Sequence, residues 1–515
     1  MKIKYIKYLT LATVLAFASC SKDYLDTYPT DETSPTTVFK TTEMVEMAVN
    51  GLAKLMVTQH ISQGFNGEGT IKMYYGEYPG NNFRVNLPGW SGIINGTYFD
   101  NTTSVYDYYP WHYYYMLITN ANQIIDQVDA AEGPDAKKKL LKAQALGYRA
   151  YSYTMLAQLY GHRWDESNNG AQACLILRRS MTDPISMPLS SLADVYKAIY
   201  EDLDQAIVLA DASGLQRGKF YEMNQDVYHA IYARAALAKK DYTTAETHAV
   251  LARAKYPLMN EAEYKAGFSN PTTEWIWGSY GASDEQLHYY AYHAYIGYNS
   301  SASAVRIYPK RISKELFDQI PDTDMRKGLF LDPKGYDGEY SLTTGEVEKP
   351  ESSKMDKDTR AKYPDLRSDA LVAAYMQFKI KANDMPGVGN MNHFRSSEMY
   401  LIEAEAQYFQ QNYAAAKATL TELNKNSGRD VAYDNAALGE AELFKQIVNY
   451  RGLELWGEGF DWFDMKRWNL DIDRKEGGKG GNYVSTLAVK VPASIGHKWT
   501  WKTPAREVDY NTELR

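Results

Sequence analysis

Carboxylates that could carry out acid–base chemistry are concentrated near the C-terminus, in the segment that begins at Arg451. Paired carboxylates are the acid and base of most glycosidases, so Glu454, Glu458 and Asp464 would be the catalytic candidates. If the segment is one helix, spacings of 3, 4 and 3 place one set of charges on a single face: Arg451, Glu454, Glu458 and Asp461. Adjacent arginines would keep these carboxylates ionised and unable to donate a proton. We therefore favour a structural ion network over a catalytic site.

The rest of the sequence lacks the recognised motifs of enzymes and metal sites. Its nine histidines are scattered, without a His-Glu-x-x-His motif or a cysteine pair, so no zinc site is indicated. It also lacks the Gly-x-Ser-x-Gly turn of hydrolases and the glycine loop that binds phosphate. The sequence predicts a protein with no enzymatic activity, no metal and no cofactor.

Tyrosine is the unusual feature of the composition. The chain of 515 residues contains 44 tyrosines and 10 tryptophans. Such rings can stack on the C–H face of a sugar while their polar groups satisfy its hydroxyls. The formal net charge is −8 and there is no long Lys/Arg run, so nucleic acid is not expected as a partner.

Two tyrosine-rich segments are the candidate ligand-binding regions. In the first, Gly and Pro residues between positions 76 and 89 indicate loops, and loops commonly carry binding residues. Rings at positions 106–115 lead into a helix and are expected in the core. The second segment covers positions 280–298. The predicted contacts are rings for stacking, two hydrogen-bond donors, and rings from the second segment: Trp90, Tyr74 and Tyr78; Asn81 and Arg84; Tyr289, Tyr290 and Tyr292.

The elements that would position these residues are mostly helices. Apolar and small residues recur with helical spacing over 140–160, and Ser191 is expected to begin another helix. A self-match 171 residues apart repeats a helix–turn–helix pattern, in which Ala233, Ala235, Asp241, Tyr242, Ala245 and Ala249 correspond to Ala404, Ala406, Asn412, Tyr413, Ala416 and Leu420. Small residues let paired helices approach closely. We predict a mainly α fold made of tetratricopeptide-like helical pairs.

A loop-rich lobe of mixed structure is expected to interrupt this scaffold, because the helical period fades after residue 256 while Gly, Pro and Asp accumulate. Alternating Trp275, Ile276 and Trp277 favour a short strand, although a turn edge fits as well. The predicted organisation is a single unit, 20–515, with a helical scaffold at 40–256 and 395–470, the lobe at 257–394 and an irregular C-terminal segment at 471–515.

The N-terminus has the pattern of an export signal. Lys2, Lys4 and Lys7 precede an apolar run of about eleven residues, too short to cross a bilayer. Ala18-Ser19-Cys20 is similar to a bacterial lipobox, so we predict a signal peptide at 1–19 and a lipid on Cys20. The alternative is a cysteine that lies near the cleavage site by chance.

Short motifs along the chain follow one another in a characteristic order. They are Cys20-Ser-Lys-Asp-Tyr-Leu-Asp26, the segment from Lys142 to Tyr153 with Leu159-Tyr160-Gly161, Val195-Tyr196, Glu274-x-Ile276-Trp277, Arg395-Ser-Ser-Glu398, Trp462-Phe-Asp-Met-Lys-Arg-Trp468 and Thr503-Pro504. Gly147 and Asn449-Tyr450 differ from the residues that are usual at these positions of the motifs. In these motifs the chain resembles the SusD/RagB family, surface lipoproteins that accompany TonB-dependent outer-membrane transporters in Bacteroidetes.

The resemblance implies a SusD-like fold without catalysis. It also implies an outer-membrane protein that faces the cell exterior and captures nutrient oligosaccharides or polysaccharide for a SusC-like TonB-dependent transporter. Capture of oligopeptides is an alternative, because aromatic and Asn side chains bind peptide backbones as well. A lid that closes the transporter without binding a ligand, or a secreted glycosidase, would be further alternatives.

Overall fold

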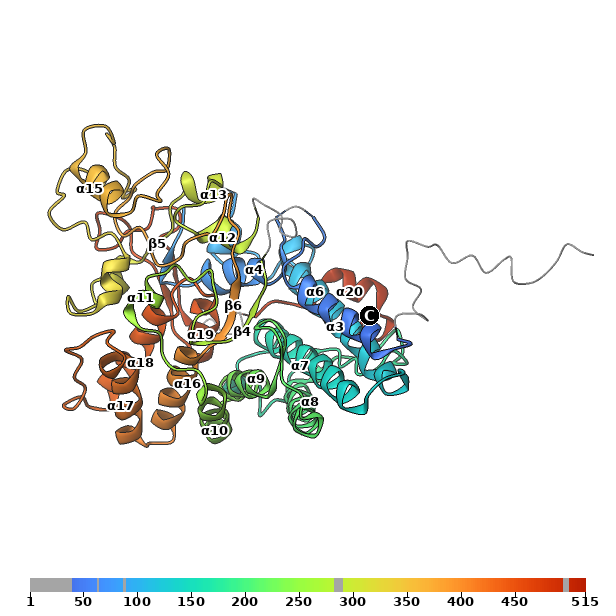
Figure 1. Ribbon diagram of the computed structural model, residues 1–515. Coiled ribbons are helices and arrows are strands. Elements are labelled where there is room, and N and C mark those ends of the chain that lie inside the picture. The colour runs from blue at the N-terminus through green and yellow to red at the C-terminus, as the bar shows by residue number, and fades with distance from the viewer. Residues whose placement is uncertain (1–38, 63, 87–88, 282–289, 494–499) are drawn as a thin grey trace, which may run out of the picture.

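The computed structural model describes residues 39–515 except 63, 87–88, 282–289 and 494–499 (Figure 1). The predicted signal peptide and Cys20 therefore lie outside the described residues. The predicted mainly α fold is confirmed. Its longer helices are α3 (Thr42–Leu55), α6 (Val105–Gln127), α7 (Asp135–Tyr160), α8 (Leu192–Ser213), α9 (Gln225–Ala238), α10 (Tyr242–Arg253), α16 (Ser396–Phe409), α17 (Tyr413–Thr421), α18 (Glu440–Glu454) and α19 (Asp461–Trp468).

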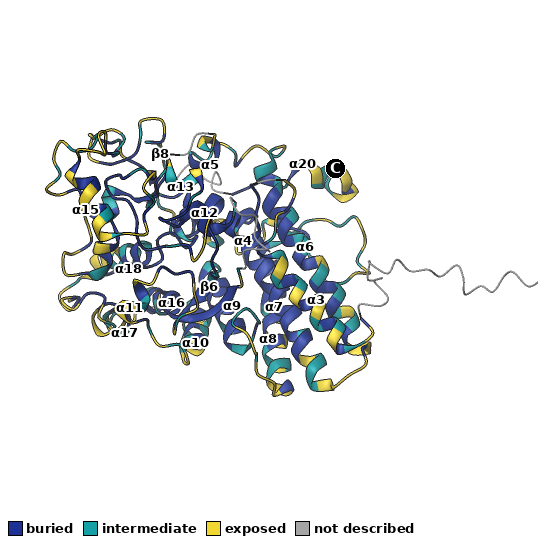
Figure 2. Ribbon diagram, turned by 45° about the horizontal axis from the view of Figure 1, so that its top comes forward, coloured by how far each residue is buried: buried dark blue, intermediate teal, exposed yellow. Residues whose placement is uncertain are grey.

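Helices α6, α7 and α8 pack in sequence order and support the N-terminal half. The helix predicted over 140–160 is α7, and Ser191 caps α8 as expected, since its Oγ accepts a hydrogen bond from the backbone N–H of Asp194 at 3.1 Å. Gly214, in the left-handed region at φ 66°, ends α8. Figure 2 shows buried residues concentrated along α7 and α12 (Tyr292–Ile296), so the core runs through the centre of the molecule.

The self-matching segments form two helical hairpins, as predicted. The turn between α9 and α10 contains Lys240 at φ 61°, and the turn between α16 and α17 contains Gln411 at φ 62°. Helix α10 packs against α16, and Glu246 on α10 accepts hydrogen bonds from Gln407 and Gln410. The two copies therefore stack on each other, which is how tetratricopeptide-like pairs build a continuous core.

The region between the hairpins is rich in loops and short elements. The strand predicted around Trp275 is confirmed as β4 (Trp275–Ser279), which pairs antiparallel with β6 (Met391–Arg395). The other antiparallel pairs are β1 (Phe83–Arg84) with β5 (Arg311–Ile312), β2 (Ala173–Leu175) with β3 (Ser190–Ser191), and β7 (Ile472–Asp473) with β8 (Lys490–Val491). The boundaries given above for the scaffold and the lobe stay a prediction.

Short helical segments connect these parts. They are α4 (Gly67–Thr70), the π-helix η2 (Ile71–Glu77), α5 (Ser91–Ile94), η3 (Val128–Ala130), η4 (Trp164–Glu166), α11 (Glu261–Tyr264), α12, α13 (Ser303–Arg306), α14 (Lys314–Phe317), η5 (Met325–Leu329), α15 (Lys354–Lys362), η6 (Glu422–Asn426), α20 (Ala505–Tyr510) and η9 (Thr512–Leu514). None of the helices in the described part of the chain combines the length and the apolar character needed to cross a membrane.

The charged segment near the C-terminus is not one helix, so this expectation is wrong. Helix α18 ends at Glu454 and α19 begins at Asp461. Gly457 and Gly459 between them have φ values of 81° and 97°, a region that L side chains rarely adopt. Gly459 also lies so close to Lys72 that an added Cβ would be 2.9 Å from the Lys72 Cα. The turn aims Glu454 and Glu458 at the lobe.

Candidate functional site

The two tyrosine-rich segments singled out from the sequence meet in the structure. The Tyr74 ring centroid lies 4.1 Å from that of Trp90 and 5.7 Å from that of Tyr295, which belongs to the second segment. Tyr290 lies 6.2 Å from Tyr295. Rings more than 200 positions apart therefore form one group. The sequence shows two clusters but cannot reveal that they meet.

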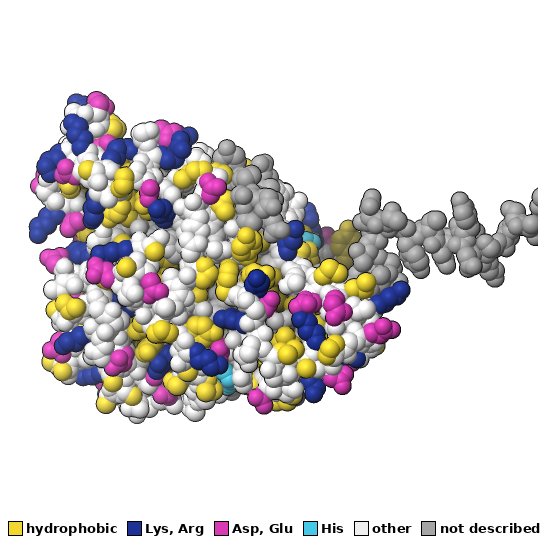
Figure 3. Space-filling model, viewed as in Figure 1, with side chains coloured by type: hydrophobic (Ala, Val, Ile, Leu, Met, Phe, Trp, Pro, Cys, Tyr) yellow, Lys and Arg dark blue, Asp and Glu magenta, His cyan; other side chains and the backbone are white. Residues whose placement is uncertain are grey.

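This aromatic cluster, as we call it, consists of Tyr74, Trp90, Tyr98, Tyr106, Tyr290 and Tyr295. Trp90, Tyr98, Tyr106 and Tyr290 are partly exposed to solvent. Tyr98 stacks on Tyr106 at 5.0 Å with the planes 9° apart, and Tyr106 packs edge-on against Trp90. In the view of Figure 3, hydrophobic side chains gather near the centre of the face, in the region of α4 and α12 in Figure 1. Rings at such a surface can stack on a ligand.

The first segment begins with a helix, and the turns and irregular backbone predicted between positions 76 and 89 follow it at residues 78–82, 85–86 and 89. Residues 71–77 form the π-helix η2, and Gly76 lets it approach Gly459, whose carbonyl oxygen would be 2.2 Å from an added Cβ. Tyr74 and Tyr78 are fully buried in consequence. The expectation that loop structure leaves these rings exposed is wrong. The Tyr74 hydroxyl donates to the carbonyl of Gly64 at 3.2 Å, and burial raises the pKa of both phenols well above the usual value.

Other predicted contact residues are held by the protein itself. Arg84 is buried and donates to the carbonyls of Asn482 and Thr344, at 2.9 and 3.0 Å. Tyr292 is buried and donates to the carbonyl of Gly457 at 2.6 Å. Asn81 is partly exposed but bridges to β7 through the Asp471 carbonyl and the Asp473 N–H.

Fewer of the predicted ligand-contact residues are exposed to solvent than the sequence indicated. Tyr289 lies outside the described residues, whereas Trp90 and Tyr290 are partly exposed within the aromatic cluster. A role in ligand binding stays a prediction for all eight residues. Sequence reasoning left out Tyr98, Tyr106 and Tyr295, which the structure places beside Trp90 and Tyr290. The helical context of Tyr106 argued for the core, and no signal in a single sequence pairs it with Trp90.

The carboxylates near the C-terminus belong to a buried ion network. Glu454 accepts from Arg326 and Arg395, each at 2.7 Å, and from Arg429 at 3.1 Å. Glu458 accepts from Lys379 at 2.7 Å and from Arg395 at 2.8 Å. We call the set Glu274, Arg326, Lys379, Arg395, Arg429, Glu454 and Glu458 the ionic network. It joins the end of α18 and the turn after it to the lobe, to β6 and to the loop that follows η6.

Electrostatics make these carboxylates poor acids. Burial alone would raise the pKa of Glu454, but the surrounding Arg429, Arg395 and Arg326 outweigh it and hold the pKa well below its usual range. Burial opposes Arg395 and Lys379 in the same way at Glu458, whose pKa is lowered to about 2. A general acid of a glycosidase needs a raised pKa and access to substrate. The structure therefore supports the predicted ion network in place of the catalytic alternative.

The arginines that hold Glu454 were not those the sequence suggested. Arg451, next to it on α18, pairs instead with Asp464 at 2.6 Å. Arg326, Arg395 and Arg429 come from distant parts of the chain, and the fold brings them to Glu454. Their positions carry no local spacing signal, which is why sequence analysis missed them.

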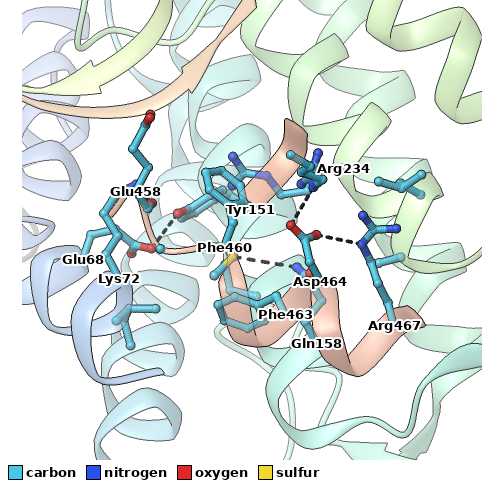
Figure 4. A pocket seen from close by; sticks show the side chains of 16 residues that line it. Glu68, Lys72, Tyr151, Gln158, Arg234, Glu458, Phe460, Phe463, Asp464 and Arg467 are labelled. Carbon is cyan, nitrogen blue, oxygen red and sulfur yellow. Dashed lines mark hydrogen bonds and ion pairs between the residues drawn. The ribbon is translucent and has the colours of Figure 1, made fainter. Parts of the chain in front are cut away.

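A cavity beside this region is too small for a sugar. It has a volume of about 30 Å³, which suits about two water molecules. Figure 4 shows charged side chains facing across it, with Tyr151 donating to Glu68 at 2.7 Å and Arg467 donating to Asp464 at 2.8 Å.

The described residues contain no group of three or more His, Cys, Asp or Glu side chains arranged to hold a metal ion. Cys174 is a buried free thiol, and burial raises its pKa to about 12. The thiol is therefore protonated at neutral pH and has little nucleophilic character.

The fold and the site define a tetratricopeptide-like helical scaffold that presents a group of aromatic rings to solvent. A family model described as "Starch-binding associating with outer membrane" matches residues 23–236, and the model of the SusD family matches residues 235–512. The chain belongs to the SusD family. No curated protein sequence matches it.

Solved structures with the same fold come from Bacteroides. A SusD-like carbohydrate binding protein from Bacteroides vulgatus is 22% identical, with a TM-score of 0.75 over 92% of this chain and 98% of its own. A SusD superfamily protein from Bacteroides thetaiotaomicron is 20% identical, with a TM-score of 0.71 over 92% and 99%. Another from Bacteroides fragilis is 18% identical, with a TM-score of 0.69 over 93% and 100%. At these identities the likeness concerns the fold.

Proposed function

We propose that this protein captures nutrient oligosaccharides or polysaccharide at the cell surface and delivers them to a SusC-like TonB-dependent transporter. The observation that carries the proposal is the aromatic cluster, where Trp90 and Tyr290 offer ring surface to solvent. Aromatic rings stack on the apolar face of sugars, and Tyr hydroxyls donate to and accept from sugar hydroxyls. Membership of the SusD family, with a carbohydrate-binding protein from B. vulgatus among the similar structures, supports this ligand class.

The proposed cellular setting is the outer membrane, with the protein facing the exterior. A lipid on Cys20, after removal of residues 1–19, would anchor the chain and keep it beside the transporter. The N-terminal pattern of lysines, apolar residues and cysteine supports this part of the proposal.

We further propose that the ligand is bound without being cleaved. Glu454 and Glu458, two of the catalytic candidates of the sequence, are buried and held ionised by arginines and a lysine, and the third, Asp464, is paired with Arg451 and Arg467. The rings of the aromatic cluster supply binding surface but no acid or base that could cleave a glycosidic bond.

Calorimetric titration against oligosaccharides and oligopeptides, with product analysis of the same samples, tests the proposal. Saturable binding of one glycan class without products is the expected result. Binding of oligopeptides alone would replace the ligand class, and release of sugars from any glycan would favour a glycosidase.

A further inference from the structure

A groove in the lobe lies apart from the aromatic cluster. It runs between η5 and α15, has a volume of about 480 Å³, and has Phe330 and Leu331 in its lining. Pockets that hold small ligands occupy roughly 300–1,000 Å³. In Figures 1 and 2, α15 lies at the edge of the molecule farthest from α6, the helix that carries Tyr106. A ligand in this groove would therefore not touch the aromatic cluster.

Two partly exposed tyrosine rings line the groove. Tyr363 stacks on Phe378, with the centroids 3.5 Å apart and the planes 2° apart. Tyr336 has the Lys354 ammonium 4.9 Å from its centroid and donates its hydroxyl to Asp358 at 2.9 Å. Tyr363 also has the Lys362 ammonium 5.1 Å from its centroid. Both rings are thus fixed by their contacts, and the part of each that is exposed is a rigid stacking surface.

The groove is lined by four carboxylates, Asp322, Asp324, Asp332 and Asp358, and by two lysines, Lys327 and Lys362. Two cations outside the lining, Arg326 and Lys354, pair with Asp324 and Asp358, and with them the charges balance. Asp322 pairs with Lys327 at 2.6 Å, and Asp358 pairs with Lys354 at 2.7 Å. Lys362 adds a further cation and Asp332 a further carboxylate, which accepts from the Lys334 N–H with one of its oxygens. Together these groups exert no strong net field on a charged polymer, but they offer donors and acceptors to hydroxyl groups.

Both walls are held in place by hydrogen bonds outside the groove. Ser353 caps α15, while Glu339 accepts from the Ser353 hydroxyl at 2.7 Å and from the Met355 N–H at 2.8 Å. On the opposite wall, buried Arg326 in η5 is tied to Asp324 and to the ionic network. A ligand would enter a preformed groove at a small cost in conformational entropy.

We propose that this groove is a second carbohydrate-binding site that takes a neutral segment of a glycan. The inference rests on the proposed function, because the ligand of the groove is the same glycan that the protein is proposed to capture. This glycan would either extend from the aromatic cluster into the groove or bind in the groove alone. Partly exposed tyrosine rings and paired donors and acceptors fit the flat C–H faces and hydroxyls of a neutral pyranose. Two contacts on one polysaccharide would raise its retention at the surface through effective concentration.

The test measures the binding of defined glycans to the full chain carrying Cys20→Ala. The probes are maltohexaose, xylohexaose and mannohexaose as neutral glycans, and hexagalacturonate as a charged one. They are titrated into the parent chain, Trp90→Ala, Tyr336→Ala with Asp332→Ala, and the combination of all three substitutions. Glu351→Ala, an exposed change in the lobe outside the groove, is the matched control.

We expect a neutral hexasaccharide still to bind Trp90→Ala, with reduced affinity. Adding the groove substitutions to this variant should raise the Kd of the remaining binding roughly 3- to 10-fold. Glu351→Ala should leave it unchanged. The inference is overturned if the groove substitutions leave the Kd of every neutral glycan unchanged, or if they change the Kd of hexagalacturonate alone. The proposed function stands in either case. A parent chain that binds none of the glycans would overturn both.

Discussion

The aromatic cluster and the ionic network use their side chains in opposite ways. Rings of the cluster reach solvent at Trp90 and Tyr290, whereas every member of the network is at least nine-tenths buried. Each charge of the network is neutralised inside the protein, as Glu454 is by three arginines. The rings meet one another, but four of them, Trp90, Tyr98, Tyr106 and Tyr290, keep surface exposed to solvent.

This difference separates structural from ligand-binding roles. A buried carboxylate that is already paired has no acceptor left for a ligand, and removing one of its partners leaves an uncompensated charge. A partly exposed ring still has apolar surface to bury, so a ligand that covers it gains free energy. The dense charged segment of the sequence therefore belongs to the buried interior, whereas the tyrosine-rich segments supply both buried rings and the few that reach solvent.

Substitution of the central arginine should have the largest effect. Arg395→Ala leaves Glu454 and Glu458 without their shared cation in a buried site, so we expect the free energy of unfolding to fall by about 3–5 kcal/mol. Urea denaturation followed by circular dichroism measures the change. Lys265→Ala removes an exposed ion pair with Glu261 and should change stability little. A loss as small as that of the control would show that the network does not support the fold.

The turn between α18 and α19 should be the next most sensitive. Gly459→Ala puts a Cβ at φ 97° and 2.7 Å from the Lys72 Cγ, so we expect a loss of about 2–4 kcal/mol of unfolding free energy. Gly428→Ala, at φ 81° with no atom within 4 Å of the added Cβ, carries the backbone strain without the clash and should cost less. Equal losses in the two variants would contradict the close approach of η2 to this turn.

Replacement of the exposed ring should affect binding more than stability. Trp90→Ala removes a stacking surface, and we expect the affinity for the captured glycan to fall roughly 5- to 30-fold. Calorimetric titration gives the ratio of dissociation constants. Trp164→Ala is the control, because Trp164 is also partly exposed but packs against Tyr196, outside the aromatic cluster. The account fails here if both variants bind as the parent chain does.

Stability should also depend on pH through two buried carboxylates. Burial, reinforced by Asp461, raises the pKa of Glu77 to about 8 from its usual 4.5. The folded state then binds this proton more tightly than the unfolded state, so the contribution of Glu77 to stability is full below pH 4.5 and is lost as pH rises towards 8. Glu458, with its pKa lowered to about 2, acts in the opposite sense and loses its contribution as pH falls from 4.5 through 2.

Glu77→Gln isolates the contribution of Glu77 to the pH dependence of stability. Its side-chain oxygen can keep the hydrogen bonds that Gly459 and Phe460 donate to Glu77, but the group no longer titrates. We expect the free energy of unfolding, measured by denaturation at pH 5 and pH 8, to fall less in the variant than in the parent chain. An identical fall in both would contradict the raised pKa.

Periodic features of the fold were predictable from the sequence. The helical spacing of apolar residues located α7, the Ser191 cap located α8, and the self-match located both hairpins. These signals are local, because helix formation depends on neighbours three and four residues apart. The break at Gly457 and Gly459 was missed, since charge spacing alone was taken to continue the helix.

The candidate site was less predictable. Tyrosine density marked both segments that form the aromatic cluster, but burial of Tyr74 and Tyr78 depends on the close packing of η2 against the turn at Gly459. Such packing joins residues nearly 400 positions apart and leaves no pattern in one sequence. For the same reason, the sequence did not reveal the arginines around Glu454, and the structure was needed to identify them.

A crystal structure of the protein with the oligosaccharide that binds most tightly in calorimetry tests the central claim most directly. The account predicts a sugar ring stacked on Trp90, with Tyr290 beside it and no cleavage of the glycan. A bound oligosaccharide that leaves the aromatic cluster uncovered, or that lies against Glu454 or Glu458 as cleaved product, would contradict it.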